Sequence, residues 1–416
     1  MMVIKMNKET INIPSIRFSK FFNVWEICKL KEISERITKK NSELESTLPL
    51  TISAQYGLVD QITYFNKRIA SKNITNYYLL ERGDFAYNKS YSKDYPWGVV
   101  KRLDGYDKGV LSTLYIVFKP TRVNSDFLLT YYDTNNWHKE VSMRAAEGAR
   151  NHGLLNITAL DFFDTNLFVP VEKEEQENIG LFFNKLDKTI TMQQQLLDDH
   201  KQLKKAMLQK MFPQKGESVP RVRFTGFTDC WKDYELSRVA EITSGGTPKT
   251  DNPKYWNGSI DWYSPTEIGK KSFVDGSKKK ITEEGLNKSS AKILPAHKTI
   301  LFTSRAGIGD MAILRKEAAT NQGFQSFVMK DNFHVYFTYS MREKIKKYAL
   351  KHSAGSTFLE ISGKTLGKIK IKYPLFKEQE KIGNYFKKLD EIIALHEQKL
   401  ETYQELKKAM LQKMFV

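Results

Sequence analysis

The chain has little cysteine and lacks long apolar runs. Its two cysteines among 416 residues, Cys28 and Cys230, provide neither a disulfide framework nor a cysteine-rich metal motif, and we expect both to fill core space. No apolar run approaches the roughly 18 residues that cross a bilayer, and the opening MMVIKMNKET lacks the apolar segment of a secretion signal. These absences argue against a secreted scaffold or a membrane protein and predict a cytoplasmic location.

The sequence also lacks the signatures of enzymes that act on nucleic acids. NPKY (Asn252–Tyr255) has lysine where an amino-methyltransferase loop needs proline, and no glycine-rich methyl-donor loop accompanies it. SGKT (Ser362–Thr365) ends like a phosphate loop, but Phe358 stands where the first glycine is required. The seven histidines show no metal-ligand spacing. We therefore predict no catalytic residue, no metal site and no cofactor in this chain.

Charge is the unusual feature that is present. Sixty-six Lys and Arg against forty-eight Asp and Glu give a net charge of +18. Such an excess predicts a polyanionic partner, and because no membrane segment is found, nucleic acid is the favoured one. The hydrophobic content of 40% and the length fit two or three folded domains.

One decapeptide occurs twice. LKKAMLQKMF stands at Leu203–Phe212 and again at Leu406–Phe415, and 21 of the 37 positions aligned from Gln176 and from Gln379 to these ends are identical. The starts of the two halves match more weakly, at Pro14–Leu30 and Pro220–Leu236. Roughly 140 residues in each half barely match. The chain is therefore a duplication in which a variable block precedes each repeated block.

The repeated blocks are predicted to be long helices. Apolar residues follow the alternating four-three spacing of a coiled-coil seam, for example Ile382, Phe386, Leu389 and Ile393. Each helix would have about 37 to 40 residues and a length of roughly 55 to 60 Å. We expect the two to pack on each other antiparallel within one chain; a coiled coil between two copies is the alternative. The methionine-rich LKKAMLQKMF end is either a docking tip or simple core packing, and both remain open.

The variable blocks are predicted to be mixed α/β domains. Short β-like runs alternate with turn signals and with a helical stretch at Val335–His352. The expected strands are Gly109–Pro120, Asn166–Val171, Lys298–Ser304, Asp310–Arg315 and Lys368–Pro374. The expected fold class is α+β: two mixed α/β domains separated by two long helices that pack as an antiparallel coiled coil with pseudo-twofold symmetry.

Several loops carry side chains suited to nucleic acid. Lys and Arg neutralise phosphates, aromatic rings pack on sugars and bases, and Arg, Asn, Gln and Lys reach base edges. His152 has a simpler alternative role, a hydrogen bond within a turn. The candidate DNA contacts are Tyr87, Asn88, Lys89, Tyr91 and Lys93 in Ala86–Gly98; Arg150, Asn151 and His152 in Glu147–Ile157; Thr247, Lys249, Thr250, Lys254, Tyr255 and Trp256 in Ser244–Tyr263; and Ser304 and Arg305 in Phe302–Asp310.

Taken together, these motifs resemble the specificity (S) subunits of type I restriction-modification systems. Helices with a segment like Phe376–Ile393 that end in LKKAMLQKMF, as here at Leu406–Phe415, are typical of that family. Stretches similar to its target recognition domains are Gly83–Leu103, Leu111–Phe118, Ser244–Gly269, Ser304–Leu314 and Thr320–Phe327, the last of which adds Asn321 and Gln322 to the candidate contacts.

The resemblance implies a function and partners. Each variable block would recognise one half of a split, asymmetric sequence in double-stranded DNA, and the helix pair would hold the two blocks apart and dock other subunits. Two modification subunits would carry S-adenosylmethionine and methylate adenine, and two restriction subunits would use ATP and Mg²⁺. The implied domains are 1–170 and 220–374 for target recognition, 171–212 and 375–416 for the repeated helices, and 213–219 as linker.

Two other classes of function remain open from the sequence. A coiled-coil scaffold whose basic charge serves solubility would bind DNA weakly and without sequence preference. An enzyme with an unrecognised site would show turnover from this chain alone. The DNA target sequence cannot be read from the residues, because base contacts depend on loop geometry.

Overall fold

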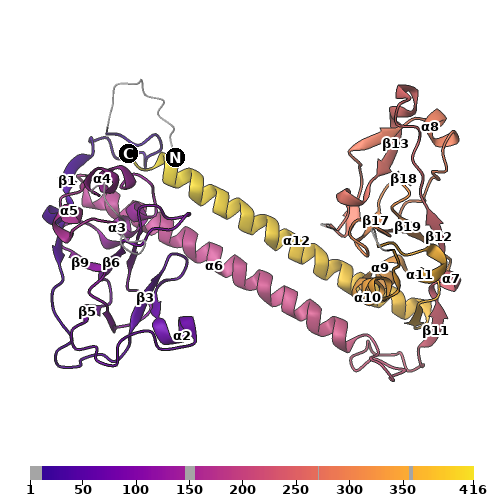
Figure 1. Cartoon of the computed structure of the whole chain (residues 1–416), viewed down its shortest axis with the longest axis horizontal. Helices are drawn as coiled ribbons and strands as arrows, with labels where there is room; N and C mark the ends of the chain where they lie inside the picture. Colours follow the sequence, from indigo (N-terminus) through magenta and orange to yellow (C-terminus); the bar gives the residue numbers. More distant parts are fainter. Residues whose placement is uncertain (1–11, 146–154, 270, 356–358) are drawn as a thin grey trace. The chain divides into compact units, whose positions relative to one another are not determined.

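A computed structural model describes residues 12–145, 155–269, 271–355 and 359–416 (Figure 1). The chain divides into two compact units. Unit 1 combines Met1–Gln193 with Lys399–Val416, and unit 2 is Gln194–Gln398. Each unit thus contains a variable block, part of the helix that follows it, and part of the other repeated helix.

Unit 1 is built around a four-stranded sheet of order β2-β9-β6-β7, with the two-stranded pairs β1-β10, β3-β4 and β5-β8 beside it. Tyr87, Phe118 and Phe162 are among the aromatic residues of its core. The elements are β1 (Glu26–Lys29), α1 (Leu30–Ile33), β2 (Ser34–Arg36), β3 (Leu50–Ser53), β4 (Gly57–Asp60), α2 (Gln61–Phe65), β5 (Tyr78–Glu81), β6 (Phe85–Asn88), β7 (Val99–Arg102), β8 (Lys108–Leu111), β9 (Ile116–Pro120), α3 (Ser125–Tyr132), α4 (His138–Arg144), α5 (Ala159–Phe163), β10 (Asn166–Val169) and the first half of α6 (Lys173–Lys210).

Unit 2 contains a five-stranded sheet of order β12-β19-β16-β17-β14 and a three-stranded sheet of order β15-β13-β18; β11 pairs with β20. The elements are β11 (Lys232–Glu235), α7 (Leu236–Val239), β12 (Ala240–Ser244), η2 (Pro253–Tyr255), β13 (Trp256–Tyr263), η3 (Pro265–Glu267), β14 (Phe273–Val274), β15 (Lys279–Ile281), α8 (Glu283–Asn287), β16 (Thr299–Phe302), β17 (Met311–Leu314), β18 (Ala319–Thr320), β19 (Gln325–Met329), α9 (Val335–Ser340), α10 (Arg342–His352), α11 (Gly363–Leu366), β20 (Lys370–Tyr373) and the first part of α12 (Phe376–Lys413). Both units are mixed, so the expected α+β class is confirmed.

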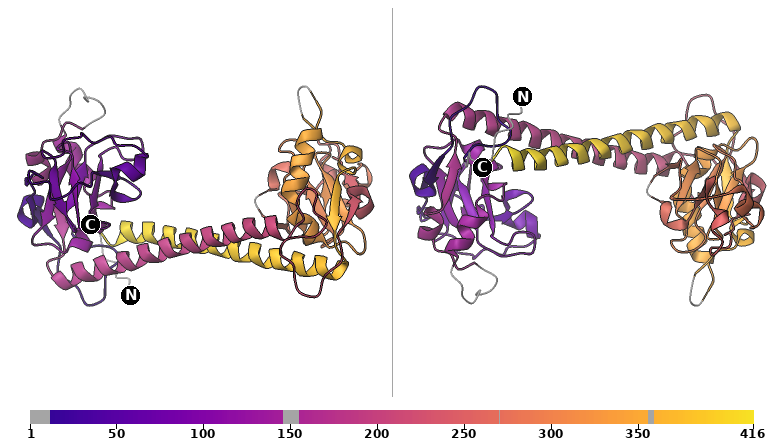
Figure 2. Two further views of the ribbon diagram at one scale, coloured as in Figure 1. Left: turned by 90° about the horizontal axis from the view of Figure 1, so that it is seen from below. Right: turned by 90° about the horizontal axis from the view of Figure 1, so that it is seen from above.

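The two repeated helices have the predicted length. The helices α6 and α12 each contain 38 residues. Within unit 2, the end of α6 lies beside the start of α12, as both views of Figure 2 show, and Lys201 forms an ion pair with Glu397 at 2.7 Å. The same unit holds an ion pair between Lys204 and Asp390.

The same buried Arg–Glu ion pair, called the lock below, fixes the start of each repeated helix. Glu175 of α6 has a fully buried side chain that accepts two hydrogen bonds from Arg17, at 2.6 and 2.7 Å. In unit 2, Glu378 of α12 accepts two from Arg223, at 2.7 and 2.8 Å. Because a buried carboxylate is costly unless it is paired, this bidentate geometry explains the arginine near the start of each variable block.

The following glutamine adds a second tie in both units. Gln176 donates to the carbonyl of Pro170 at 2.8 Å and accepts from the backbone N–H of Asn124 at 2.8 Å. Gln379 donates to the carbonyl of Pro374 at 2.9 Å and accepts from the backbone N–H of His334 at 2.9 Å. The duplicated Glu-Gln pair therefore joins each helix to the variable block that precedes it.

Both copies of LKKAMLQKMF end in a core. In unit 1, Phe415 packs against Trp25 and Phe127, with ring centroids 6.0 and 5.6 Å apart. In unit 2, Phe212 packs against Trp231 and Phe337, at 5.9 and 5.3 Å. Of the two roles left open for the end of the decapeptide, a docking tip or core packing, Phe212 and Phe415 therefore have the second: they pack in a core.

The structure corrects three local predictions. The helical stretch Val335–His352 is divided at Met341 into α9 and α10. The expected strand Gly109–Pro120 is two strands, β8 and β9. Cys230 is exposed and does not fill core space, whereas Cys28 is half-buried and burial raises the pKa of its thiol to about 12. The exposed side chain of Cys230 lies one residue before the buried Trp231, on the first residues of the second block.

Candidate nucleic-acid interface

Unit 2 brings together loops that are far apart in sequence. The loop after β12 packs on the turn after β18, where the N–H of Gly246 donates to the carbonyl of Thr320 at 2.9 Å. At Gly245 a methyl group would lie 2.2 Å from the carbonyl oxygens of Thr320 and Asn321, so only glycine allows this approach. The predicted segments Ser244–Tyr263 and Thr320–Phe327 therefore form one surface.

The loop after β16 joins the same surface. The N–H of Ser304 donates to the carbonyl of Gly323 at 2.8 Å, and the carbonyl of Ser304 accepts from Ile361 at 3.1 Å. The loop turns through Ala306 and Gly307, which have positive φ angles of 52° and 106°. It is closed by the N–H of Asp310, which donates to the hydroxyl of Thr303 at 2.9 Å. Three predicted segments thus meet at one edge of the sheet, and the segment around Ile361 joins them there.

Polar and basic side chains cover this edge. Thr247 donates a hydrogen bond to the side chain of Gln322, which ties two of the predicted contacts together. Lys249, Lys254 and Gln322 are exposed, and Arg305 is half-buried. Within the described residues, neither lysine nor Arg305 forms an ion pair, so their charges remain available for an anion. This combination suits contacts to phosphates and to base edges. Thr250 is exposed and Asn321 half-buried at the same edge.

Trp256 and Tyr255 have a supporting role. The indole N–H of Trp256 donates to the carbonyl of Lys249 at 3.1 Å, and its ring meets that of Trp262 edge-on at 5.1 Å. Trp262 in turn donates to the carbonyl of Gly246 at 2.9 Å. Tyr255, half-buried, accepts at its carbonyl from the N–H of Thr282 at 3.0 Å. The aromatic residues hold the loop in shape while Lys249 and Lys254 face solvent.

Two predicted contacts are wrong because their side chains are buried. Ser304 lies inside, with its hydroxyl 3.5 Å from the carboxylate of Glu360. Tyr87 of unit 1 is a core residue: its ring stacks on that of Phe162 at 4.3 Å, and its hydroxyl donates to the carbonyl of Trp97 at 2.8 Å. Burial raises the pKa of Tyr87 far above its usual range. Phe85, Ala86 and Tyr87 of β6 are all fully buried, so a loop motif that overlaps this strand places some of its residues in the core.

Asn88, the last residue of β6, is followed by the candidates Lys89, Tyr91 and Lys93 on the loop to β7. Asn88 accepts from the N–H of Ser90 at 3.0 Å, and Lys89 donates to the carbonyl of Ile157 at 3.4 Å. Both are half-buried, while Tyr91 and Lys93 are exposed. The predicted contacts Arg150, Asn151 and His152 lie outside the described residues. The N–H of Leu155 donates to the carbonyl of Lys89 at 2.8 Å, so the segment that follows them adjoins this loop.

Sequence reasoning missed the residues that support this edge. Lys346 of α10 reaches Asp310 at 2.8 Å and fixes the far end of the Ser304–Asp310 loop. Gln325 at the start of β19 faces Gly363 of α11, where a methyl group would lie 2.6 Å from its amide oxygen. No sequence spacing indicates either contact, because each joins elements that are distant along the chain.

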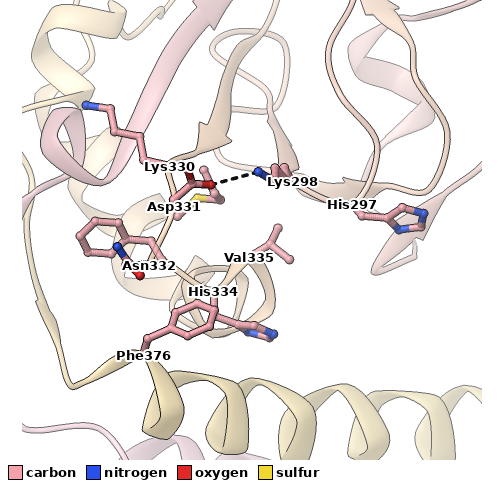
Figure 3. A pocket seen from close by; sticks show the side chains of 10 residues that line it. His297, Lys298, Lys330, Asp331, Asn332, His334, Val335 and Phe376 are labelled. Atoms are coloured by element: carbon pink, nitrogen blue, oxygen red, sulfur yellow. Dashed lines mark hydrogen bonds and ion pairs between the residues drawn. The ribbon is translucent and has the colours of Figure 1, made fainter.

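A pocket of about 260 Å³ lies elsewhere in unit 2, where β19 leads into α9 (Figure 3). Its polar groups are engaged: Lys298 points to Asp331 and forms an ion pair at 3.1 Å (Figure 3). His334 caps α9 through a hydrogen bond from the N–H of Phe337, and burial lowers the pKa of its ring. We regard this pocket as structural.

In the part of the chain that the structure describes, no helix has an apolar stretch that could cross a membrane. Among the same residues, no group of three or more His, Cys, Asp or Glu side chains is arranged to hold a metal ion.

Comparisons with known proteins agree with these features. Residues 228–404 match the family model described as the type I restriction modification DNA specificity domain. A stretch of 194 residues, 45% of this chain, is 31% identical to the MjaIX type I restriction enzyme specificity subunit of Methanocaldococcus jannaschii, but spans only 44% of that protein. The putative MjaX specificity subunit of the same organism is 23% identical over 93% of this chain and 92% of its own length.

A solved structure supports the fold. The crystal structure of a type I restriction-modification S subunit from M. genitalium has a TM-score of 0.60 and 15% identity, covering 97% of this chain and 99% of that one. The matched family region contains the loops Ser244–Tyr263, Phe302–Asp310 and Thr320–Phe327 that meet at one edge of unit 2. Residues 228–404 are thus similar to the DNA specificity domain of type I restriction-modification systems, and the chain over most of its length resembles a putative specificity subunit of that kind.

Proposed function

We propose that this chain is the DNA-recognition subunit of a type I restriction-modification complex. Each variable block recognises one half of a bipartite, asymmetric target in double-stranded DNA. The observation that carries the proposal is the edge of unit 2, where Thr247, Arg305 and Gln322 come from three separate segments within the matched specificity domain.

The two repeated helices serve as spacer and docking surface in this proposal. They form an antiparallel coiled coil, and the chain has pseudo-twofold symmetry. Support comes from the ion pairs Lys201–Glu397 and Lys204–Asp390. The later residue of α6 pairs with the earlier residue of α12, as expected for helices that run in opposite directions. The duplicated locks at Glu175 and Glu378 support the symmetry. A 38-residue helix measures roughly 57 Å, which limits the spacing of the half-sites to under about two turns of DNA.

Catalysis belongs to partner subunits. Two modification subunits supply S-adenosylmethionine and methylate adenine, and two restriction subunits supply the ATP- and Mg²⁺-dependent nuclease. This chain itself carries no cofactor and no catalytic residue, and it works in the cytoplasm. The recognition domains are 1–170 and 220–374, the helical regions 171–212 and 375–416, and the linker 213–219.

The test is to co-express the chain with a modification subunit and to map methylated adenines by single-molecule sequencing. We expect one bipartite, asymmetric motif that is absent when either protein is omitted. Methylation by this chain alone would point to an enzyme. Complete assembly without any motif, together with sequence-indifferent DNA binding, would point to a scaffold.

A further inference from the structure

Positive charge is concentrated in one part of unit 2. From the start of α10 to the end of β20, Arg342–Tyr373, the sequence has nine Lys or Arg and two Glu, a net charge of +7. The corresponding part of the first half, from α4 to the end of β10, His138–Val169, has three Lys or Arg and four Asp or Glu, a net charge of −1. The two halves thus differ by eight charges in matching positions.

Only some of these cations are neutralised. Lys346 pairs with Asp310 and Lys372 with Asp233, both at 2.8 Å, and Arg342 lies 4.0 Å from Asp390. In contrast, Lys347, Lys351 and Lys364 are exposed and form no ion pair within the described residues. Lys347 and Lys351 are one helical turn apart, where two like charges destabilise a helix slightly.

The helix dipole explains only part of this cluster. Cations in the last turn of α10, such as Lys351, are favourable there. That effect does not reach Lys347 in the middle of the helix or Lys364 on another element, because it fades within one turn. The free charges therefore call for an anionic partner.

The basic region is continuous with the candidate interface. The hydroxyl of Tyr348 donates to the carbonyl of Thr365 at 3.4 Å and so joins α10 to α11, which lie near each other in Figure 1. Gly363, next to Lys364, packs against Gln325. Gln325 pairs in the sheet with Ser244, the residue at which the Ser244–Tyr263 loop begins.

A second connection runs through the other loop. Lys346 holds Asp310 at the end of the Ser304–Asp310 loop, and Ile361 donates to Ser304 at its start. Both α10 and the segment before α11 therefore contact the loop that carries Arg305. A DNA strand with one phosphate bound at Arg305 would place its next phosphates over Lys364 and the exposed side of α10.

We propose that Lys347, Lys351 and Lys364 form a phosphate track that extends the unit 2 interface and binds duplex DNA without regard to sequence. The inference rests on the proposed function. It adds a difference between the two halves. The second recognition domain holds the duplex beside its half-site, whereas the matching part of the first half has a net charge of −1 and no equivalent excess of positive charge.

The test uses the assembled complex with modification subunits and the triple variant K347Q/K351Q/K364Q. A matched control, K298Q/K316Q/K330Q, removes the same amount of charge. These three lysines lie at the ends of β16, β17 and β19 that point away from the candidate interface. DNA affinity is measured over a range of salt concentrations, and methylated adenines are mapped for each variant.

We expect the triple variant to lower the slope of log affinity against log salt by about 2 to 3, since each phosphate contact contributes about 0.9. The methylated motif should stay the same, and the control should keep the wild-type slope. An unchanged slope with a wild-type motif would overturn the track alone. Loss of modification-subunit assembly in the triple variant would also overturn it and assign the surface to a protein partner. Absence of a motif in the wild type would refute the proposed function instead.

Discussion

At the scale of single residues, position within a strand or loop separates candidate DNA contacts from core residues. Tyr87 and Lys249 both come from aromatic- and lysine-rich motifs, yet Tyr87 is buried and Lys249 is exposed. Composition indicated which segments are rich in such side chains but could not indicate which of their residues are buried, because burial depends on where β6 ends. Ser304 was misjudged for the same reason: it lies between a buried strand and the exposed turn at Ala306.

Arg305 is the residue on which we expect specificity to depend most. It has no ion-pair partner within the described residues and lies beside Gly323 at the edge where three loops meet. The change R305A should weaken DNA binding by about 1 to 3 kcal/mol and relax recognition in one half of the motif. Methylation mapping measures the second effect. K298A, at the other end of β16, is the control, and an unchanged motif with R305A would contradict the assignment.

Tyr87 should affect stability and not recognition. The change Y87F removes the hydroxyl that donates to Trp97, which should lower the free energy of unfolding by about 1 kcal/mol. Its buried ring remains, so the methylated motif should be unchanged. Denaturant unfolding and methylation mapping of the same variant provide the check. A stable variant with an altered motif would restore Tyr87 as a DNA contact.

At the scale of elements, the duplicated helices are tied to their surroundings by matched polar pairs. The locks at Glu175 and Glu378, together with the ion pairs of Lys204 and Lys407, recur at equivalent positions in the two repeats. The repeat and the helix lengths could be predicted from the sequence because they follow from a fixed spacing of residues. The partners of these charges were not, since Arg17 lies 158 residues from Glu175.

The lock at Glu175 should be worth far more than a surface ion pair. The change E175Q leaves Arg17, itself largely buried, without its carboxylate, and should destabilise unit 1 by about 3 to 5 kcal/mol. The adjacent E174Q is the matched control: Glu174 pairs with Lys20 but is exposed, so its loss should cost under about 1 kcal/mol. Urea unfolding of the two variants compares them directly, and equal stabilities would disprove the lock.

Asp133 should make unit 1 sensitive to acid. Burial raises its pKa, but the ammonium groups of Lys101 and Lys407, at 2.9 and 3.1 Å, outweigh burial and hold the pKa below its ordinary value. A lowered pKa in the folded state gives stability that is present above the ordinary carboxyl pKa, roughly 4, and is lost as the pH falls through the folded value.

The variant D133N tests this linkage. It should be less stable than the wild type at neutral pH, and the difference should shrink as the pH falls below about 4. Unfolding curves recorded from about pH 7 to pH 3 measure it. D107N, which removes an exposed carboxylate from a surface pair with Arg82, should follow the wild-type profile. A constant difference between D133N and wild type at all pH values would exclude the linkage.

At the scale of the whole molecule, the repeated decapeptide and the variable blocks have different structural settings. The ends of both helices are built into folded cores, so LKKAMLQKMF must stay the same while the loops around Arg305 and Lys89 can change. Sequence alone shows the duplication and the divergence between the two halves. It could not predict which loops meet, since Gly246, Ser304 and Gly323 lie apart in sequence and come together only in the folded domain.

The central claim is that each variable block recognises its own half of the target. The most direct measurement exchanges Lys39–Asp164 for the first block of another specificity subunit and maps methylated adenines after co-expression with the modification subunit. We predict that one half of the motif is replaced while the other half and the spacing between them are kept. A motif that is unchanged, or one in which both halves change, would contradict the account.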